Sequence, residues 1–275
     1  MASPFDLVGL AEVKSWLDVS GTDDDMLLAR LITQISRAIL SIIDRPTILP
    51  SPYVEVRDGG NDVAIMLRQW PVIEIVSCVV NGVPVLPSPQ LIAGASTQAG
   101  YILDSSDVSP PGAMQRLCLR RHLFTAGIQN VIISYTAGYQ VTNESAVVPT
   151  TAPYTVSVQA PYGRWAADAG VAYSNGRPLA AIVGAPGVGQ YAVATGIYNF
   201  AQTDAGSTVV ISYGYVPADL ASCCMDWVAE RYAYRSRIGQ HSKSLGGQES
   251  IAFIVKEIPD YVSGALDPYR RLVVP

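Results

Sequence analysis

The charged residues with the clearest pattern lie near the end of a long helical stretch. No acidic residue occurs between positions 231 and 243, and this segment contains four cations: Arg231, Arg235, Arg237 and Lys243. Single cations at the C-terminal end of a helix commonly do no more than complement its dipole. As a cluster they favour a basic surface that docks on an acidic partner surface or on nucleic-acid phosphate. The pattern leaves these two partners open.

Other residues capable of chemistry are scarce. The chain has two histidines and only four cysteines, which are Cys78, Cys118, Cys223 and Cys224. Adjacent residues on a helix point about 100° apart, so the last two cannot easily bridge or share a metal. No nucleophile elbow or phosphate-binding loop occurs. We expect reduced core cysteines in a cytoplasmic protein, no metal, no cofactor and no catalytic site.

Three acidic residues, Asp23–Asp25, stand before a strongly periodic segment. They lack the ligand alternation and distal glutamate of a calcium loop, so we interpret them as the capped first turn of a helix, with Thr22 or Asp23 as N-cap. That helix is predicted over 24–44. Its apolar residues recur at helical spacing: Leu28, Leu31, Ile32, Ile35, Ile39 and Ile42. A shorter helix is predicted over 10–17, with Val13, Trp16 and Leu17 on one face.

A third helix is predicted from Pro217 and Asp219 to a stop at Gly239. Its large residues surround most of its circumference, which is typical of a helix buried on several sides and central to its fold. Beyond it, Tyr261, Val262 and Leu266 fit a short helix that ends before Pro268.

Between the helices the pattern changes to period two, which predicts strands. The segment 54–67 reads as two strands around a Gly-Gly-Asn turn, and Asn81-Gly82 marks a hairpin. Further strands are predicted over 101–104, 115–120 and 130–135. Residues 140–208 read as an insertion, because ISYTAGY at 133–139 and ISYGY at 211–215 would join smoothly without them. Strand-like pieces in this insertion predict a small β-sandwich or barrel.

The predicted fold class is therefore α+β. Two N-terminal helices and a long C-terminal helix form a helical core with an antiparallel β-sheet, and a small β-sandwich or barrel is inserted. We expect a core of residues 1–139 and 209–275, and an inserted β domain of residues 140–208.

The overall composition limits the possible functions. Hydrophobic residues make up 49% and charged residues 15% of the chain, which indicates a globular protein with part of its surface covered. The formal net charge of −5 argues against nucleic-acid binding by the chain as a whole. We expect no signal peptide and no membrane span.

Three segments together resemble the head–tail connector, or adaptor, proteins of tailed bacteriophages. They are LAEVKSWLDVSGTDDDMLLARLITQISRAIL, WPVIEIVSCVVNGVPV, and VPADLASCCMDWVAERYAYRSRIGQHSKSLGGQES followed by LDPYRRLVV. The insertion is similar to a small β module of phage structural proteins, and it departs from the shorter adaptors.

The resemblance implies a structural virion protein without catalysis or cofactors. It would form a ring, usually of twelve copies, at the neck of the virion after assembly in the host cytoplasm. The ring would bind the portal protein and a stopper or tail-completion protein, and genomic DNA would pass through it without sequence-specific binding. The resemblance also implies an arm that docks on the portal or a neighbouring subunit, and this arm contains Tyr269, Arg270, Arg271, Leu272 and Val273.

Two other classes of function stay open. A β-rich tail or adhesion protein that binds carbohydrate would use an aromatic stacking platform in the insertion, formed by Tyr154, Tyr162, Trp165 and Tyr173. The alternative role for these aromatic residues is packing in a small core. An enzyme is the most distant possibility, because no catalytic set was found.

Overall fold

The computed structural model describes residues 5–88, 98–104, 115–160, 162–235, 242–245, 249–252 and 259–271. The chain divides into two compact units. Met1–Pro46 and Pro217–Arg270 belong to a helical unit, and Thr47–Val216 with Arg271–Pro275 belong to a β unit. The fold class is α+β, as predicted, with mostly antiparallel sheets. Across the described ranges, every helix falls short of the length and apolar character required to cross a bilayer.

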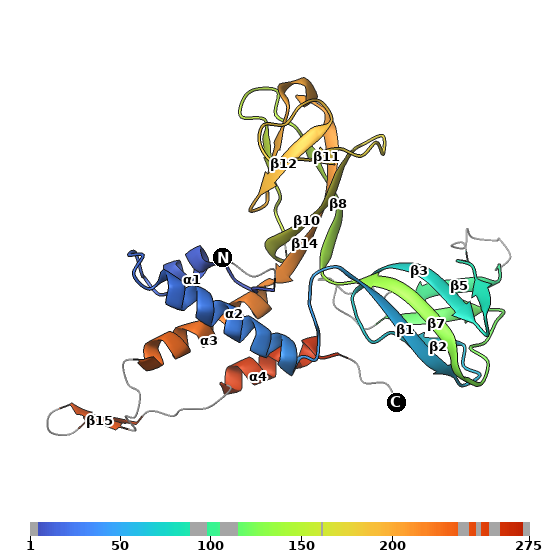
Figure 1. Cartoon of the computed structure of the whole chain (residues 1–275), viewed down its shortest axis with the longest axis horizontal. Coiled ribbons are helices and arrows are strands. Elements are labelled where there is room, and N and C mark those ends of the chain that lie inside the picture. Colours follow the sequence, from blue (N-terminus) through green and yellow to red (C-terminus); the bar gives the residue numbers. More distant parts are fainter. Residues whose placement is uncertain are drawn as a thin grey trace. The chain divides into compact units, whose positions relative to one another are not determined.

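The helical unit brings together helices from the N-terminal and C-terminal parts of the sequence (Figure 1). Its third helix contacts each of the other α-helices, in keeping with the central place predicted for it. The elements are α1 (Leu10–Trp16), α2 (Asp25–Ile42), α3 (Ala218–Tyr234), α4 (Asp260–Leu266) and the short 3-10 helix η3 (Asp267–Tyr269).

Helix α2 follows its sequence pattern closely. Leu28, Ile32, Ile35 and Ile39 form its buried stripe, and each is at most 5% exposed. The stripe faces the other helices because side chains three and four positions apart share one side of a helix. In this way a local pattern of leucine and isoleucine fixes both the length of the helix and the side that packs.

The acidic residues before α2 bind side chains from the other helices, whereas the sequence predicted that they cap α2. The N-cap is Asp24 rather than Thr22 or Asp23, and it makes no side-chain capping hydrogen bond. Asp24 instead accepts hydrogen bonds from α3, and Asp25 pairs with Lys14 of α1 at 2.6 Å. The capping interpretation was therefore wrong, because cations and a hydroxyl from other helices bind these carboxylates.

Two further helix predictions need correction or limitation. Val13 of α1 is fully buried, but Trp16 is 59% exposed, so the predicted apolar face of this helix is only partly covered. Pro217 is the N-cap of α3 rather than a residue of its first turn. The predicted stop at Gly239 lies outside the described residues.

The first part of the β unit consists of two sheets around one hydrophobic cluster. The larger sheet has the order β1 (Ser51–Gly59), β7 (Gly127–Ala137), β3 (Val72–Val80) and β4 (Val83–Val85). The smaller has the order β2 (Ala64–Met66), β6 (Arg116–Arg120) and β5 (Gly100–Asp104). Side chains that face inward from both sheets fill the space between them, for example Ile133 of β7 and Leu117 of β6.

Both turn predictions in this region are confirmed, although the strands on either side of the Gly-Gly-Asn turn belong to different sheets. β3 and β4 form the hairpin predicted at Asn81-Gly82, where both residues have positive φ, as a two-residue hairpin turn requires. β1 and β2 do not pair with each other: β1 pairs with β7, and β2 pairs with β6. The Gly-Gly-Asn turn therefore carries the chain from one sheet to the other.

Residues 140–217 build two further sheets around a second cluster. One sheet has the order β10 (Gly163–Tyr173), β14 (Thr208–Pro217) and β8 (Gln140–Val147). The other has the order β11 (Ala180–Ala181), β12 (Gln190–Ala194), β13 (Ile197–Phe200) and β9 (Thr155–Ser157). Tyr198, Ile211 and Tyr213 are fully buried in the cluster that these strands share. That residues 140–208 form an inserted domain of their own stays a prediction.

Aromatic residues gather where β7 leads into β8 and where β14 ends. The Tyr139 ring meets the Trp70 ring edge-on at 6.4 Å between centroids and the Tyr215 ring at 5.8 Å. Tyr139 and Tyr215 come from the two similar segments ISYTAGY and ISYGY. The junction is also tied by a backbone hydrogen bond from Tyr215 N to Tyr139 O. A final hairpin is formed by β15 (Ser242–Leu245) and β16 (Glu249–Ala252).

Candidate interaction surface of the helical unit

The predicted basic cluster is only partly described. Arg235 follows α3 directly, and Arg231 lies half-buried on the same helix. The backbone of Lys243 lies in β15, opposite Ile251. Arg237 lies outside the described residues. Because Arg237 is not among the described residues, the basic docking cluster stays a prediction.

Arg235 holds α3 to the start of α2. Its guanidinium donates to both carboxylate oxygens of Asp24, at 2.6 and 3.0 Å, and lies over the Tyr232 ring at 4.2 Å. The Tyr232 hydroxyl also donates to Asp24, at 2.5 Å. The hydrogen bonds from Arg235 and then Tyr232 lower the pKa of Asp24 to about 2. The charge of Arg235 is therefore already neutralised within the unit.

The predicted C-terminal arm is anchored at its beginning. The Tyr269 hydroxyl lies 2.5 Å from each carboxylate oxygen of Asp219, in the first turn of α3. Tyr269 is 9% exposed, and Arg270 pairs with Asp267 at 3.1 Å on the exposed side. Arg271 is half-buried, and Leu272 and Val273 lie outside the described residues. Tyr269 therefore fixes the base from which the arm starts.

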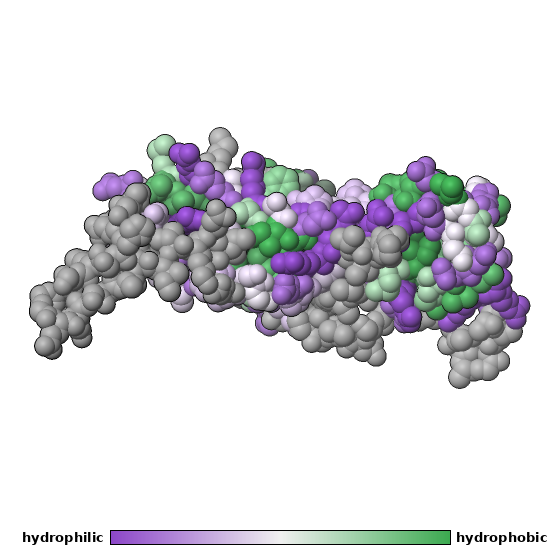
Figure 2. Space-filling model, turned by 90° about the horizontal axis from the view of Figure 1, so that it is seen from below, coloured by the Kyte–Doolittle hydropathy of each residue, from purple (hydrophilic) through white to green (hydrophobic). Residues whose placement is uncertain are grey.

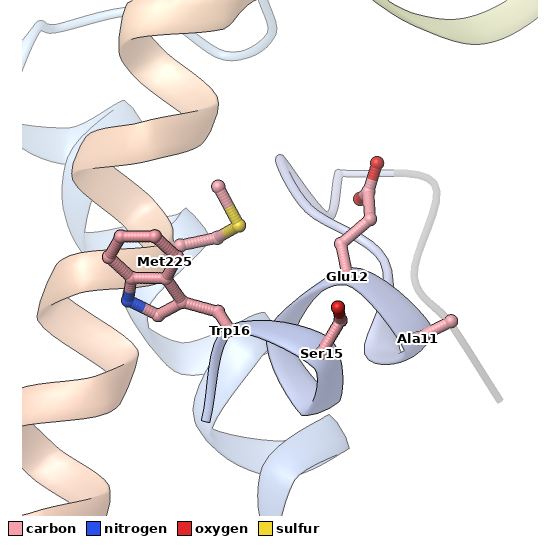
Figure 3. Close-up of a pocket in the computed structure, with 5 residues that line it drawn as sticks. All are labelled: Ala11, Glu12, Ser15, Trp16 and Met225. Atoms are coloured by element: carbon pink, nitrogen blue, oxygen red, sulfur yellow. The ribbon is translucent and has the colours of Figure 1, made fainter. Parts of the chain in front are cut away.

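A shallow hollow of about 460 Å³ lies between α1 and α3 (Figure 3). Ala11, Glu12, Ser15, Trp16 and Met225 line it. The Trp16 indole and the Met225 thioether extend toward each other, whereas the Glu12 carboxylate points away from both. That carboxylate accepts the Gly9 amide at 2.7 Å. The hollow offers apolar surface for a partner side chain, and its lining lacks a pair of groups for acid–base chemistry.

Among the described residues no cysteine forms a disulfide, and Cys78, Cys223 and Cys224 are buried. Burial raises the pKa of the Cys78 thiol to about 11, which favours the unreactive protonated form. No group of three or more histidine, cysteine or carboxylate side chains suited to a metal ion occurs among the residues that the structure describes.

The four aromatic residues of the possible carbohydrate platform are placed mainly in the core of the β module. Tyr154, Trp165 and Tyr173 pack against its hydrophobic cluster. The Trp165 indole nitrogen donates to the Tyr198 hydroxyl at 3.2 Å, and the Tyr173 hydroxyl donates to Asp204 at 2.7 Å. Tyr162 is 37% exposed, but its ring lies beside that of Tyr215. The four rings therefore do not form one exposed stacking surface.

No protein-family model matches the sequence, and no curated protein matches it either. Among solved structures, the chain is similar to a chain from the virion of a native gene transfer agent particle. The TM-score is 0.42 at 14% identity, over 100% of this chain and 95% of that chain. It is also similar to a chain from the neck of an empty gene transfer agent particle, with a TM-score of 0.37 at 13% identity and the same coverage. At these low scores, neither likeness decides the fold or the function.

Sequence reasoning missed two kinds of residue on the helical unit. The bridge between Asp24 and α3 joins positions more than 200 apart in sequence, and no local pattern reports such a contact. The exposed side of α2 carries Arg30 and Arg37, and this feature could have been found. The absence of any acidic residue from position 26 to 43 is visible in the sequence.

Proposed function

We propose that this chain is a structural virion protein that forms a ring adaptor between the portal of the DNA-filled head and the tail or stopper. The ring would contain about twelve copies and would extend the DNA channel without sequence-specific binding. Its role would be assembly rather than catalysis, so no cofactor is needed.

The observation that carries this proposal is where the resembling segments lie. The N-terminal segment and the segment from Val216 onward provide the main resemblance to phage connectors. These same segments come together as one helical unit, although some 170 residues separate them in the sequence. A resemblance that is split in sequence but joined in space favours a shared helical framework over chance matches of single motifs.

The anchored start of the C-terminal arm agrees with the proposed docking role. Tyr269 is held by Asp219, so the chain has a fixed position on the helical unit immediately before Arg270. We propose that Arg270, Arg271, Leu272 and Val273 contact the portal or a neighbouring subunit. The cations Arg231, Arg235, Arg237 and Lys243 are proposed to border the same docking region.

The experiment that tests this function is a copy count in purified particles. Quantitative mass spectrometry would measure this chain relative to the major capsid protein and the portal. We expect about a dozen copies per particle, because a closed ring needs a small fixed number. Hundreds of copies would instead indicate a capsid or tail-tube component, and absence from the particle would refute the proposal.

A further inference from the structure

Two helices of the helical unit carry surface stripes of opposite charge. On α2 the exposed positions Arg30, Gln34, Arg37 and Ser41 follow one another at helical spacing, opposite the buried stripe. The two arginines lie about 10 Å apart along the helix, from seven residues at 1.5 Å each. Within the described ranges neither arginine has a salt bridge, and no carboxylate shares this stripe.

The side of α3 that lies beside α4 and η3 has the reverse character. Asp226 and Glu230 lie one turn apart, with Asp219 at the start of the same side, and no cation interrupts them. The residues of α3 that reach α2 lie on the opposite side: Cys224, whose sulfur is 3.5 Å from Ser36 of α2, and Arg235, which binds Asp24. The acidic stripe therefore points away from α2.

The surroundings of Tyr261 give an independent sign of this negative surface. Burial, followed by the negative charges of Glu230 and Asp226, raises the pKa of Tyr261 to about 12. Both carboxylates are half-buried beside α4, and no salt bridge is formed by either of them in the described part of the chain. A cation brought to this place would meet two uncompensated negative charges.

We propose that the basic stripe of α2 in one copy of this chain packs against the acidic stripe of α3 in the next copy. The two stripes are on different sides of one unit, so each copy offers one face to each neighbour. Such a head-to-tail contact generates rings when the rotation closes. The inference rests on the proposed ring, and it names the surfaces that join its subunits.

Charge complementarity favours a second copy over another occupant. The chain itself provides both members of the pair, with arginine side chains long enough to reach carboxylates on a facing helix. The alternative occupant of the basic stripe is duplex DNA, but DNA would leave the acidic stripe without a function. The contact should also be salt-dependent, because the screening length falls from about 8 Å at 0.15 M salt to about 3 Å at 1 M.

The test uses charge reversal in the full-length chain. One variant carries Arg30→Glu and Arg37→Glu, and the other carries Asp226→Lys and Glu230→Lys. A control variant with the same charge change as the first carries Arg121→Glu and Arg177→Glu in the β unit. Circular dichroism checks that each variant folds, and mass photometry measures assembly as a function of concentration.

We expect each stripe variant to raise the concentration for half-assembly by about tenfold or more, because like charges then face each other across the contact. The control should assemble like the wild type. Mixing the two stripe variants should restore assembly, because each contact then joins opposite charges. A single chain with all four substitutions should also assemble, but should not join wild-type rings.

Several results would overturn the inference. One is normal assembly of either stripe variant. Another is a mixture of the two stripe variants that does not assemble. A third is a wild-type chain that stays monomeric at every accessible concentration. If Arg30→Glu with Arg37→Glu abolished duplex DNA retention in a gel-shift assay while assembly was unchanged, the stripe would belong to nucleic acid instead. None of these results refutes the ring adaptor itself, which depends on the copy count in particles.

Discussion

Replacing Tyr269 by phenylalanine should loosen the C-terminal segment of the helical unit without changing its shape. The substitution removes only the hydroxyl, which lies 2.5 Å from both carboxylate oxygens of Asp219. The ring remains, so the apolar contacts of this largely buried side chain should persist. The change therefore isolates the polar link between η3 and the start of α3.

The expected magnitude follows from the type of bond that is lost. A hydrogen bond to a charged group contributes about 1.5–3 kcal/mol to stability. Asp219 is exposed to solvent, so the lower end, about 1.5 kcal/mol, applies here. Since 1.4 kcal/mol corresponds to a factor of ten, local opening of this segment should become about tenfold more frequent.

Hydrogen exchange measured by mass spectrometry is the suitable assay, because it reports local opening directly. Peptides that cover residues 259–271 should exchange about ten times faster in Tyr269→Phe than in the wild type. Peptides from α2 should be unchanged. Tyr261→Phe is the matched control, since this tyrosine is 51% exposed and no hydrogen bond of its hydroxyl is seen among the described residues. Equal exchange in Tyr269→Phe and wild type, or equal acceleration in both variants, would refute the anchoring role.

Three further substitutions test the interior and the helix bridge. Leu28→Ala should lower the free energy of unfolding, measured by chemical denaturation, by about 2.7–5 kcal/mol, because it leaves a cavity at a fully buried position of α2. Leu31→Ala is the control and should cost less, because Leu31 is only half-buried. Glu55→Gln should cost about 3–5 kcal/mol, because it leaves buried Arg57 without its carboxylate partner; a loss below about 1 kcal/mol would contradict this. Asp24 has a lowered pKa, so its stabilising effect should be complete above pH 3.8 and should disappear as the pH falls toward 2. The thermal midpoint of Asp24→Asn should therefore lie below that of wild type at pH 5 and approach it at pH 2, and a constant gap would contradict the assignment.

Local signals predicted the parts of the fold that depend on neighbouring residues. The leucine and isoleucine spacing of α2 and the Asn-Gly turn between β3 and β4 are examples, since each is decided within a few residues. β10 was missed, because its sequence GRWAADAGVAY contains alanine, glycine and aspartate, which are uncommon in strands. This strand forms because β14 pairs with it and the shared core covers it, which is information from outside the segment.

Local sequence signals predict even less of the candidate site, because its contacts join distant parts of the chain. Periodicity placed Trp16 on an apolar face, but it cannot say whether another element covers that face, and here the indole is exposed. The sequence found the cations near Arg235 but not Asp24, which neutralises one of them. Predicting a basic surface needs the positions of the acidic side chains, and these are decided by packing of the two chain ends.

An exposed apolar row crosses the outer side of the larger sheet of the first β module. Val56 of β1 and Val79 of β3 are both neighbours of Ile132 on β7, and Val56 and Ile132 are 48% and 40% exposed. Hydrophobic residues are visible on the surface of this part of the molecule in Figure 2. Proline occurs in both edge strands of this sheet, as Pro52 and Pro84, which protects the edges against strand addition.

The pairing of β8 with β14 has a consequence for how such a chain can change over evolution. Gln140 is the cross-strand partner of Gly214, so the segment between them starts and ends at neighbouring points, roughly 5 Å apart. A short turn could close that gap, and the strands on either side would keep their course. We therefore predict that residues 141–213 can be gained, lost or exchanged as one unit. For protein engineering, we expect the same position to accept an inserted foreign domain in place of these residues.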